Sequence, residues 1–275
     1  TPAEGCKFVN WTIDGVDAGS ENPMELVVTS TTEVKANFKE IKKTLPKVYV
    51  ETPNGVAITS KEVWTEECII RIEDELGEEV MNTTTNFRGR GNSTWSYPKK
   101  PYAIKLDSKA EVLGMPKHKR WVLLANWLDH SMIRNTVAFD IAHAIESAVK
   151  SNNLAQGIPW NVHGYNVELV VDGHYVGNYY LCEQIKIHDD RLAIKDPYED
   201  VIKENPSPAL ADCGYLLEFD SKEDNDPKFT TDNNVPVKFK DDKISGTTLA
   251  AAIQEKVQRI EDNLDAGSYK AAYND

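Results

Sequence analysis

The strongest constraint on the fold is a change in hydrophobic period near residue 131. From Ser131 to about Val149, apolar residues recur at the spacing of an amphipathic helix, and Asp129 or Ser131 can cap its start. The apolar segments before this helix are short, and they alternate with polar residues or form brief continuous runs, as strands do. The apolar positions that define the helix are Ile133, Val137, Ile141, Ala144, Ile145 and Ala148.

Strands are expected on both sides of this helix. Pro101–Leu106 alternates, with Lys105 on the face opposite Tyr102, and Trp121–Ala125 is a continuous apolar run typical of a buried strand. The order of strands, helix, strands and helix predicts an α+β fold. Further strands are expected at 48–50, 69–72 and 214–220, a hairpin at 167–171 and 175–187 around an Asp172-Gly173 turn, and a second helix at about 247–264.

Residues 1–45 are expected to form a separate module of short strands. Lys7–Ile13 alternates up to an Asp14-Gly15 turn, and Leu26–Val28 and Val34–Phe38 supply further strands. Such a small set of strands holds little core and is marginal by itself. Leu45-Pro46 marks a boundary, so residues 46–275 are expected to form the main domain.

The chain as a whole is acidic, with a net charge of −13. Such a surface repels nucleic acid, so no nucleic-acid partner is expected. The sequence has no run of about 18 apolar residues, so no membrane span is expected in this chain. The four cysteines form no C-x-x-C pair, which argues against a zinc site and leaves disulfides and buried thiols as alternatives.

One basic segment, from Arg88 to Arg120, interrupts this acidic chain. It holds nine Lys and Arg residues and two acids, a local charge of +7, so the remainder carries −20. Gly89 and Gly91 permit close backbone approach, and guanidinium groups bind phosphate bidentately, so the segment predicts an anion site. The alternative is a solvated loop that docks on the protein's own acidic surface. The sequence contains no P-loop, no nucleophile elbow and no H-E-x-x-H.

Several short motifs follow one another in a characteristic order. They are Arg88-Gly89-Arg90-Gly91-Asn92-Ser93-Thr94-Trp95, Lys99-Lys100-Pro101-Tyr102, Leu113-Gly114-Met115, Trp121-Val122-Leu123-Leu124-Ala125-Asn126, Arg134-Asn135, Gly177-x-Tyr179-Tyr180-Leu181-x-Glu183-Gln184 and Gly214-Tyr215-Leu216-Leu217-Glu218. Together they resemble the spore-coat protein H (CotH) kinase family over roughly residues 46–275.

This resemblance implies an atypical protein-kinase-like domain, with a mixed sheet and packed helices. It also implies transfer of the γ-phosphoryl group of ATP, with Mg²⁺, to Ser or Thr of secreted or coat proteins. Residues 1–45 resemble the small β-repeats that precede functional domains in bacterial surface proteins, as a partial copy. The expected location is therefore extracellular or on a bacterial cell surface, with ATP and a secreted or surface protein as partners.

Phosphoryl transfer needs cations at the phosphates and carboxylates for the metal ion. Arg88 and Lys100 are the first candidates for phosphate contact, and Lys105 is a candidate for the kinase-like strand lysine. The remaining nucleotide-binding candidates are Asn126, Arg134 and Glu183. The structural alternative for Asn126 and Arg134 is to tie the helix to the sheet. For Glu183 it is a salt bridge with Arg134 or Arg88.

The chain departs from the family in its acids. The family's catalytic acids lie in Asn-x-Asp and Trp-Asp-x-Asp segments, and residues 1–275 contain no Trp-Asp-x-Asp. The expectation is a truncated kinase domain that is inactive as this fragment, with Asp220 and Asp241 as substitute catalytic acids or as surface acids. The metal ligands are not assigned.

Two other functions remain open. The first is a non-catalytic extracellular binding or adhesion module whose basic segment holds an anion. The second is a hydrolase that uses Glu183 with Asp220.

Overall fold

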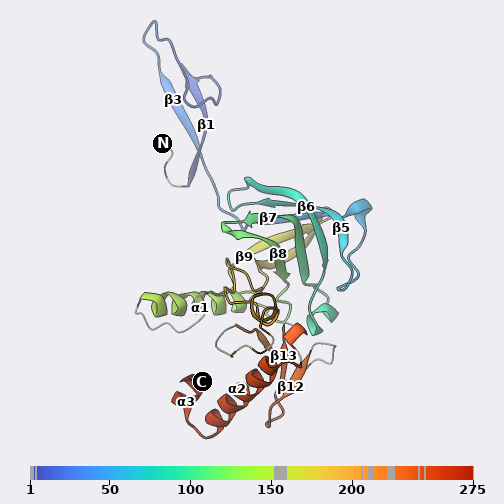
Figure 1. Cartoon of the computed structure of the whole chain (residues 1–275). Coiled ribbons are helices and arrows are strands. Elements are labelled where there is room, and N and C mark those ends of the chain that lie inside the picture. The colour runs from blue at the N-terminus through green and yellow to red at the C-terminus, as the bar shows by residue number, and fades with distance from the viewer. Residues whose placement is uncertain are drawn as a thin grey trace. The chain divides into compact units, whose positions relative to one another are not determined.

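A closed barrel of strands forms the centre of the first of two compact units (Figure 1). The computed structural model describes residues 3, 5–151, 160–205, 207, 209, 214–221, 227–240, 242–244 and 246–274. The first unit comprises Thr1–Ile145 and Val162–Gln184, and the second comprises Glu146–Asn161 and Ile185–Asp275. Strands and helices occur together, which confirms the α+β class.

The barrel has the strand order β10-β8-β7-β6-β5-β4-β9, and β9 pairs with β10 to close it. Neighbouring strands are antiparallel except β4 and β9, which are parallel. The strand bounds are β4 Lys47–Glu51, β5 Thr65–Glu73, β6 Glu79–Gly89, β7 Tyr102–Val112, β8 Met115–Leu124, β9 Gly164–Val171 and β10 His174–Glu183.

Alternating residues of the barrel strands fill its interior. Val48, Ile70 and Leu123 are almost completely buried there, and Phe87 stacks on Tyr102 with ring centres 4.8 Å apart. This follows from the two-residue period of a strand, which sends every second side chain to the same face. Lys105, between two inward-facing residues of β7, lies on the outer face as expected.

The β9–β10 hairpin confirms the predicted tight turn. Asp172 and Gly173 both have positive φ values, of 48° and 78°, as a type I′ turn requires. The Asp172 carboxylate also accepts hydrogen bonds from the backbone N–H and the hydroxyl of Thr52, at 2.7 and 2.8 Å. The turn is therefore tied to the end of β4.

Helix α1, Arg134–Ser151, follows β8 and packs on the barrel through residues that the apolar pattern does not include. Phe139 stacks on Tyr180 of β10, and Asn166 of β9 donates to the Thr136 hydroxyl at 3.1 Å. The apolar positions that predicted this helix are instead about half exposed, among them Ile133 (51%), Val137 (46%), Ile141 (56%) and Ile145 (59%).

The N-terminal strands are β1 Cys6–Ile13, β2 Val16–Asp17 and β3 Val34–Glu40, in the order β2-β1-β3. The strand expected at Leu26–Val28 is wrong. The short β2 takes the place beside β1 immediately after the Asp14-Gly15 turn, and Val27 is 87% exposed. The apolar residues Leu26–Val28 therefore lie outside the sheet.

The second unit contains a small sheet and two helices. Thr247 caps α2 by accepting a hydrogen bond from the Ala250 N–H, which confirms the predicted helix and its start. The expected strand at 214–220 is shorter than predicted. The elements are the π-helical segment Pro197–Ile202, β11 Leu217–Phe219, β12 Lys228–Thr230, β13 Pro236–Phe239, a 3-10 turn at Asp242–Ile244, α2 Thr248–Asp265 and α3 Tyr269–Asn274. None of the helices in the described residues has the length and apolar character needed to cross a membrane.

Candidate functional site

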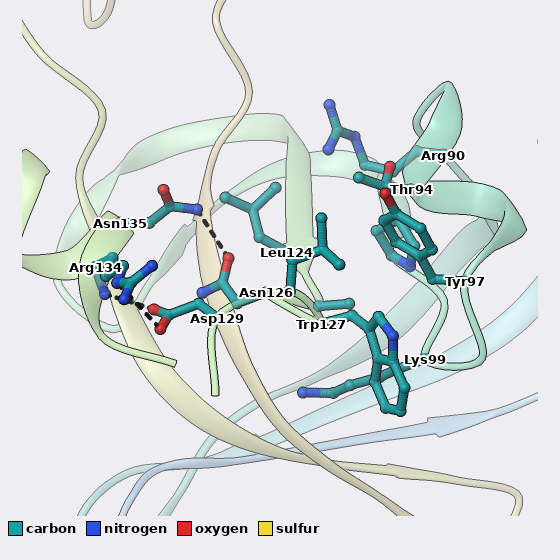
Figure 2. Close-up of a pocket in the computed structure, with 13 residues that line it drawn as sticks. Arg90, Thr94, Tyr97, Lys99, Leu124, Asn126, Trp127, Asp129, Arg134 and Asn135 are labelled. Carbon is teal, nitrogen blue, oxygen red and sulfur yellow. Dashed lines mark hydrogen bonds and ion pairs between the residues drawn. The ribbon is translucent and has the colours of Figure 1, made fainter. Parts of the chain in front are cut away.

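A cavity of about 340 Å³ lies in the first unit, beside the end of β8 (Figure 2). Three segments line it: the loop between β6 and β7, the turn that follows β8, and the start of α1. Its lining residues are Arg90, Thr94, Tyr97, Lys99, Pro101, Leu124, Ala125, Asn126, Trp127, Leu128, Asp129, Arg134 and Asn135. The basic segment and the helix start thus meet at one place.

The loop between β6 and β7 is held in shape by its glycines and lysines. A Cβ on Gly89 would lie 2.2 Å from the Trp95 ring, and Gly91 has a φ of +91°. Lys100 donates to the Trp95 carbonyl at 2.7 Å and lies 5.3 Å from the centre of its ring. These contacts fold the loop, with its 3-10 turn at Ser93–Ser96, over Gly89.

Two cations of this loop face the cavity. Burial lowers the pKa of Arg90, and among the described residues its guanidinium group has no hydrogen-bond or ion-pair partner. Burial also lowers the pKa of Lys99, whose ammonium group donates to the Asn178 carbonyl and lies 4.4 Å from the centre of the Tyr179 ring. Arg90 is therefore a charge held in the cavity wall that the described protein does not neutralise.

Polar side chains fix the opposite wall to the start of α1. The Asn135 side-chain amide donates to Asn126 Oδ1 at 2.8 Å, and Arg134 lies beside Asp129 (Figure 2). The Asp129 carboxylate accepts the Arg134 backbone N–H at 2.8 Å and the Ser131 hydroxyl at 2.6 Å. Hydrogen bonds, that of Ser131 first, lower the pKa of Asp129. Asn126 has a φ of 49°, which turns the chain from β8 towards the helix.

Arg88 does not line the cavity. Its guanidinium carbon lies 4.5 Å from the centre of the Trp64 ring, and that of Arg120 lies 5.1 Å from the same ring. Arg88 also donates to the backbone carbonyl of Glu62 at 3.0 Å. Burial, and then the charge of Arg88, lower the pKa of Arg120. We call Arg88 and Arg120, which share the Trp64 ring, the arginine pair.

Of the predicted nucleotide-binding residues, the cavity brings together Asn126 and Arg134. Lys100 is directed to Trp95, and Lys105 lies on the outer barrel face opposite Arg120 in the β7–β8 register. Arg90 and Lys99, each close in sequence to a predicted residue, line the cavity in their place. The sequence pointed to Arg90 and Lys99 only through the positive charge of residues 88–120. That charge does not tell which of two neighbouring basic residues faces the cavity.

Glu183, the last residue of β10, is almost completely buried, at 1% exposure. One carboxylate oxygen accepts the His163 backbone N–H at 3.1 Å and lies 3.1 Å from its ring Nδ1. The His163 ring stacks on His143 of α1, with ring centres 4.2 Å apart. Glu183 thus joins the end of the barrel to this histidine stack.

Neither of the two candidate catalytic acids lines the cavity as described, and Asp220 belongs to the second unit. Asp220 accepts a hydrogen bond from Lys238 at 2.9 Å, and Lys238 is fully buried. Asp241 lies outside the described residues. Within the described part of the chain, no cluster of three or more His, Cys, Asp or Glu side chains forms a candidate metal site.

Comparison with known proteins identifies the family. The family model described as CotH kinase protein matches residues 87–275, which is more than half of the chain. The match begins within β6, so β4 and β5 of the barrel precede it. The comparison with curated proteins gave no match. On the family match, the chain belongs to the CotH kinase protein family.

Proposed function

We propose that this chain binds ATP by its phosphates in the cavity beside β8, as part of a kinase-type phosphotransferase. The observation that carries the proposal is Arg90, a partly buried guanidinium group without an anionic partner among the described residues. A charge removed from water is costly unless something pairs with it. A phosphate group would supply two or more oxygens to the N–H donors of Arg90.

The order of elements supports an atypical kinase fold. A glycine-containing loop joins β6 to β7, the strand β8 follows, and helix α1 comes next. Protein kinases cover the ATP phosphates with a glycine-rich loop between strands, before a third strand and a helix. Here the loop itself supplies Arg90 and Lys99 to the cavity.

The other lining residues suit a nucleotide. Arg134 enters from the first turn of α1, where its backbone N–H and Nε face Asp129. Tyr97 and Trp127 are aromatic, and an aromatic ring can stack on the base of a nucleotide. In this proposal, Arg90 and Lys99 hold the phosphates, Arg134 adds charge from the helix side, and an aromatic face holds the base.

The cavity is less suited to a magnesium ion. Mg²⁺ prefers carboxylate oxygens, and the one carboxylate in the lining, Asp129, already accepts several hydrogen bonds. Where Mg²⁺ accompanies ATP, it would supply positive charge that offsets the charge of the phosphates. The cavity residues bind and orient the phosphates, and we assign no metal-dependent step to them.

The wider proposal rests on the family. We propose that the acceptor is a Ser or Thr hydroxyl of a secreted or surface protein, and that the protein acts outside a bacterial cell. The competing function is an adhesion module whose basic segment binds an acidic glycan or protein. Arg90, which has no described partner, could bind the phosphates of ATP or the anionic groups of a glycan or protein. Measuring which ligand binds therefore decides between the two functions.

Variants of the cavity test the proposal. Thermal unfolding of the whole chain is followed with and without ATP and Mg²⁺, for wild type, Arg90→Gln and Lys117→Gln. Lys117 is an exposed residue of β8 outside the cavity, so its variant controls for loss of charge. ATP should raise the midpoint of wild type and Lys117→Gln, and the shift should largely vanish in Arg90→Gln. Equal ATP-induced shifts of the unfolding midpoint in all three proteins would show that Arg90 does not contribute to ATP binding.

A further inference from the structure

The arginine pair is a second concentration of positive charge, separate from the cavity. Arg88 and Arg120 stand on neighbouring parts of the outer barrel face and share the Trp64 ring. Neither arginine lines the cavity. Two like charges at one indole repel each other, and the charge of Arg88 contributes to the lowered pKa of Arg120. The Trp64 ring stabilises each cation, but it does not remove the repulsion between the two arginines.

No acid in the described part of the chain neutralises the pair. Neither guanidinium group forms an ion pair with a described residue. The neighbouring Glu62 contributes its backbone carbonyl to Arg88, while its 77% exposed side chain lies 3.9 Å from Lys61. An arginine has five N–H donors, and the one hydrogen bond of Arg88 within the described residues uses one of them. Donors on both residues are thus left for a ligand.

The Trp64 ring prepares the pair for an anion. Stacking on an aromatic ring engages the flat face of a guanidinium group and limits its rotation. The N–H groups lie along the edge, where a carboxylate or phosphate can accept two parallel hydrogen bonds. The described contacts therefore place both guanidinium groups against Trp64 and leave N–H donors of each without a described partner, among them the buried Nε of Arg88.

The pair lies beside the cavity. The Arg90 backbone N–H donates to the Pro101 carbonyl at 3.1 Å, which continues the β6–β7 pairing past Gly89. Arg88 and Arg90 are separated by one residue, so their Cα atoms are about 7 Å apart along an extended chain. An anion at the pair and a phosphate at Arg90 would be neighbours.

We propose that Arg88 and Arg120 form a second anion subsite, which binds an acidic side chain of a protein segment lying next to the nucleotide phosphates. As a statement about substrate choice, it rests on the proposed kinase function: the acceptor would carry a carboxylate or a phosphorylated residue close to its hydroxyl. The acidic remainder of the protein, at −20, repels such a segment elsewhere and directs it to the basic segment.

Peptide binding to the whole chain tests the subsite. The probes are three fluorescent peptides with one Ser, flanked by Glu residues, by Gln residues, or by one phosphoserine among Gln residues. Affinity is measured by fluorescence anisotropy for wild type, Arg120→Gln, Arg120→Lys and Lys117→Gln. Arg120→Lys keeps the charge and removes the planar fork, so it remains informative if the glutamine variant does not fold.

The expected result is that the Glu or phosphoserine peptide binds wild type about 10-fold more tightly than the Gln peptide. Arg120→Gln should lose this preference, Arg120→Lys should weaken it, and Lys117→Gln should keep it. Whichever anionic peptide binds more tightly identifies the source of the oxyanion. Preference that survives in Arg120→Gln, or that falls equally in Lys117→Gln, overturns the proposal.

A parallel ATP titration separates this proposal from the previous one. If Arg120→Gln weakens ATP binding but not peptide binding, the pair belongs to the nucleotide site and the second subsite is wrong. If the wild type does not bind ATP yet binds the acidic peptide through Arg120, the proposed nucleotide function fails and the subsite stands.

Discussion

Single side chains decide where the basic segment directs its charge. Arg90 faces the cavity while Arg88 stacks on Trp64, and Lys99 faces the cavity while Lys100 contacts Trp95. Arg88 and Lys100 thus contact indole rings while Arg90 and Lys99 line the cavity, and Lys99 also lies over the Tyr179 ring. The aromatic contacts keep the loop in one shape, because a cation over an indole contributes about 0.5–1 kcal/mol at an exposed site.

The close contact of Gly89 with Trp95 gives a first prediction. In Gly89→Ala, the added methyl would overlap the ring, with a Cβ only 2.2 Å from it. The free energy of unfolding should fall by about 1–3 kcal/mol, measured by urea denaturation. In a Trp95→Leu background, which removes the overlapping ring, the same change should cost much less. Equal costs in both backgrounds would contradict the contact.

A second prediction concerns the thiol of Cys68. Burial, assisted by the charge of Asp172, raises its pKa to about 11, so very little thiolate exists at pH 8. Alkylation of the folded protein at pH 8, followed peptide by peptide by mass spectrometry, should modify Cys68 at least about 10-fold more slowly than the partly exposed Cys6. Urea should remove the difference. Similar rates in the folded protein would contradict the burial of Cys68.

At the scale of elements, the start of α1 positions the cavity wall. Asp129 holds the first N–H of the helix, and Asn135 holds Asn126 at the end of β8. Carboxylates at a helix N-terminus are stabilised by its unpaired N–H groups. The same carboxylate that begins the helix therefore orients Arg134 for the cavity.

This contact predicts a pH dependence. The pKa of Asp129 is lowered below its ordinary value of 3.8, so its contribution to stability is present above about pH 4 and is lost as the pH falls through the lowered pKa. Asp129→Ala should be less stable than wild type at pH 7, and the difference should shrink towards pH 3, measured by denaturant midpoints. Ser131→Ala, which keeps the carboxylate, should cost less. A difference that is constant with pH would contradict this role.

A further prediction concerns the ion pair between the end of β11 and β13. Lys238 is fully buried and donates to Asp220 at 2.9 Å. Asp220→Asn should lower the free energy of unfolding by up to about 3 kcal/mol, because it removes a charge that pairs with a buried ammonium group. Combining it with Lys238→Met should recover part of that loss. A catalytic role without a structural one would leave the stability of Asp220→Asn unchanged.

Some of the helices, strands and turns could be predicted from the sequence, and others could not. The Asp172-Gly173 hairpin and α2 could be predicted, because turn residues with positive φ and a capped apolar face are local signals. Strand β6 was missed, since its Thr- and Asn-rich centre hides the inward face of Met81, Thr85 and Phe87. The packing face of α1 could not be predicted either, because Phe139 and Thr136 face the barrel while its apolar stripe is partly exposed.

At the scale of the whole molecule, an acidic chain carries one basic segment, and the family match places that segment within the CotH kinase protein region. The charge of the segment was readable from the sequence. Its division into a cavity and the arginine pair was not, because that depends on how the β6–β7 loop folds and on which face of β8 carries Arg120. We expect nucleotide phosphates at the cavity and an acidic side chain of a protein segment at the arginine pair.

The central claim is that the cavity binds nucleotide phosphates, and calorimetric titration of the whole chain tests it most directly. With Mg²⁺ present, affinity should decrease from ATP to ADP to AMP, and ATP binding should weaken as salt rises from about 0.05 to 0.5 M. Arg90→Gln should bind ATP at least about 10-fold more weakly than wild type. Absence of binding heat with millimolar ATP, together with tight binding of an acidic polysaccharide, would contradict the claim and favour the adhesion function.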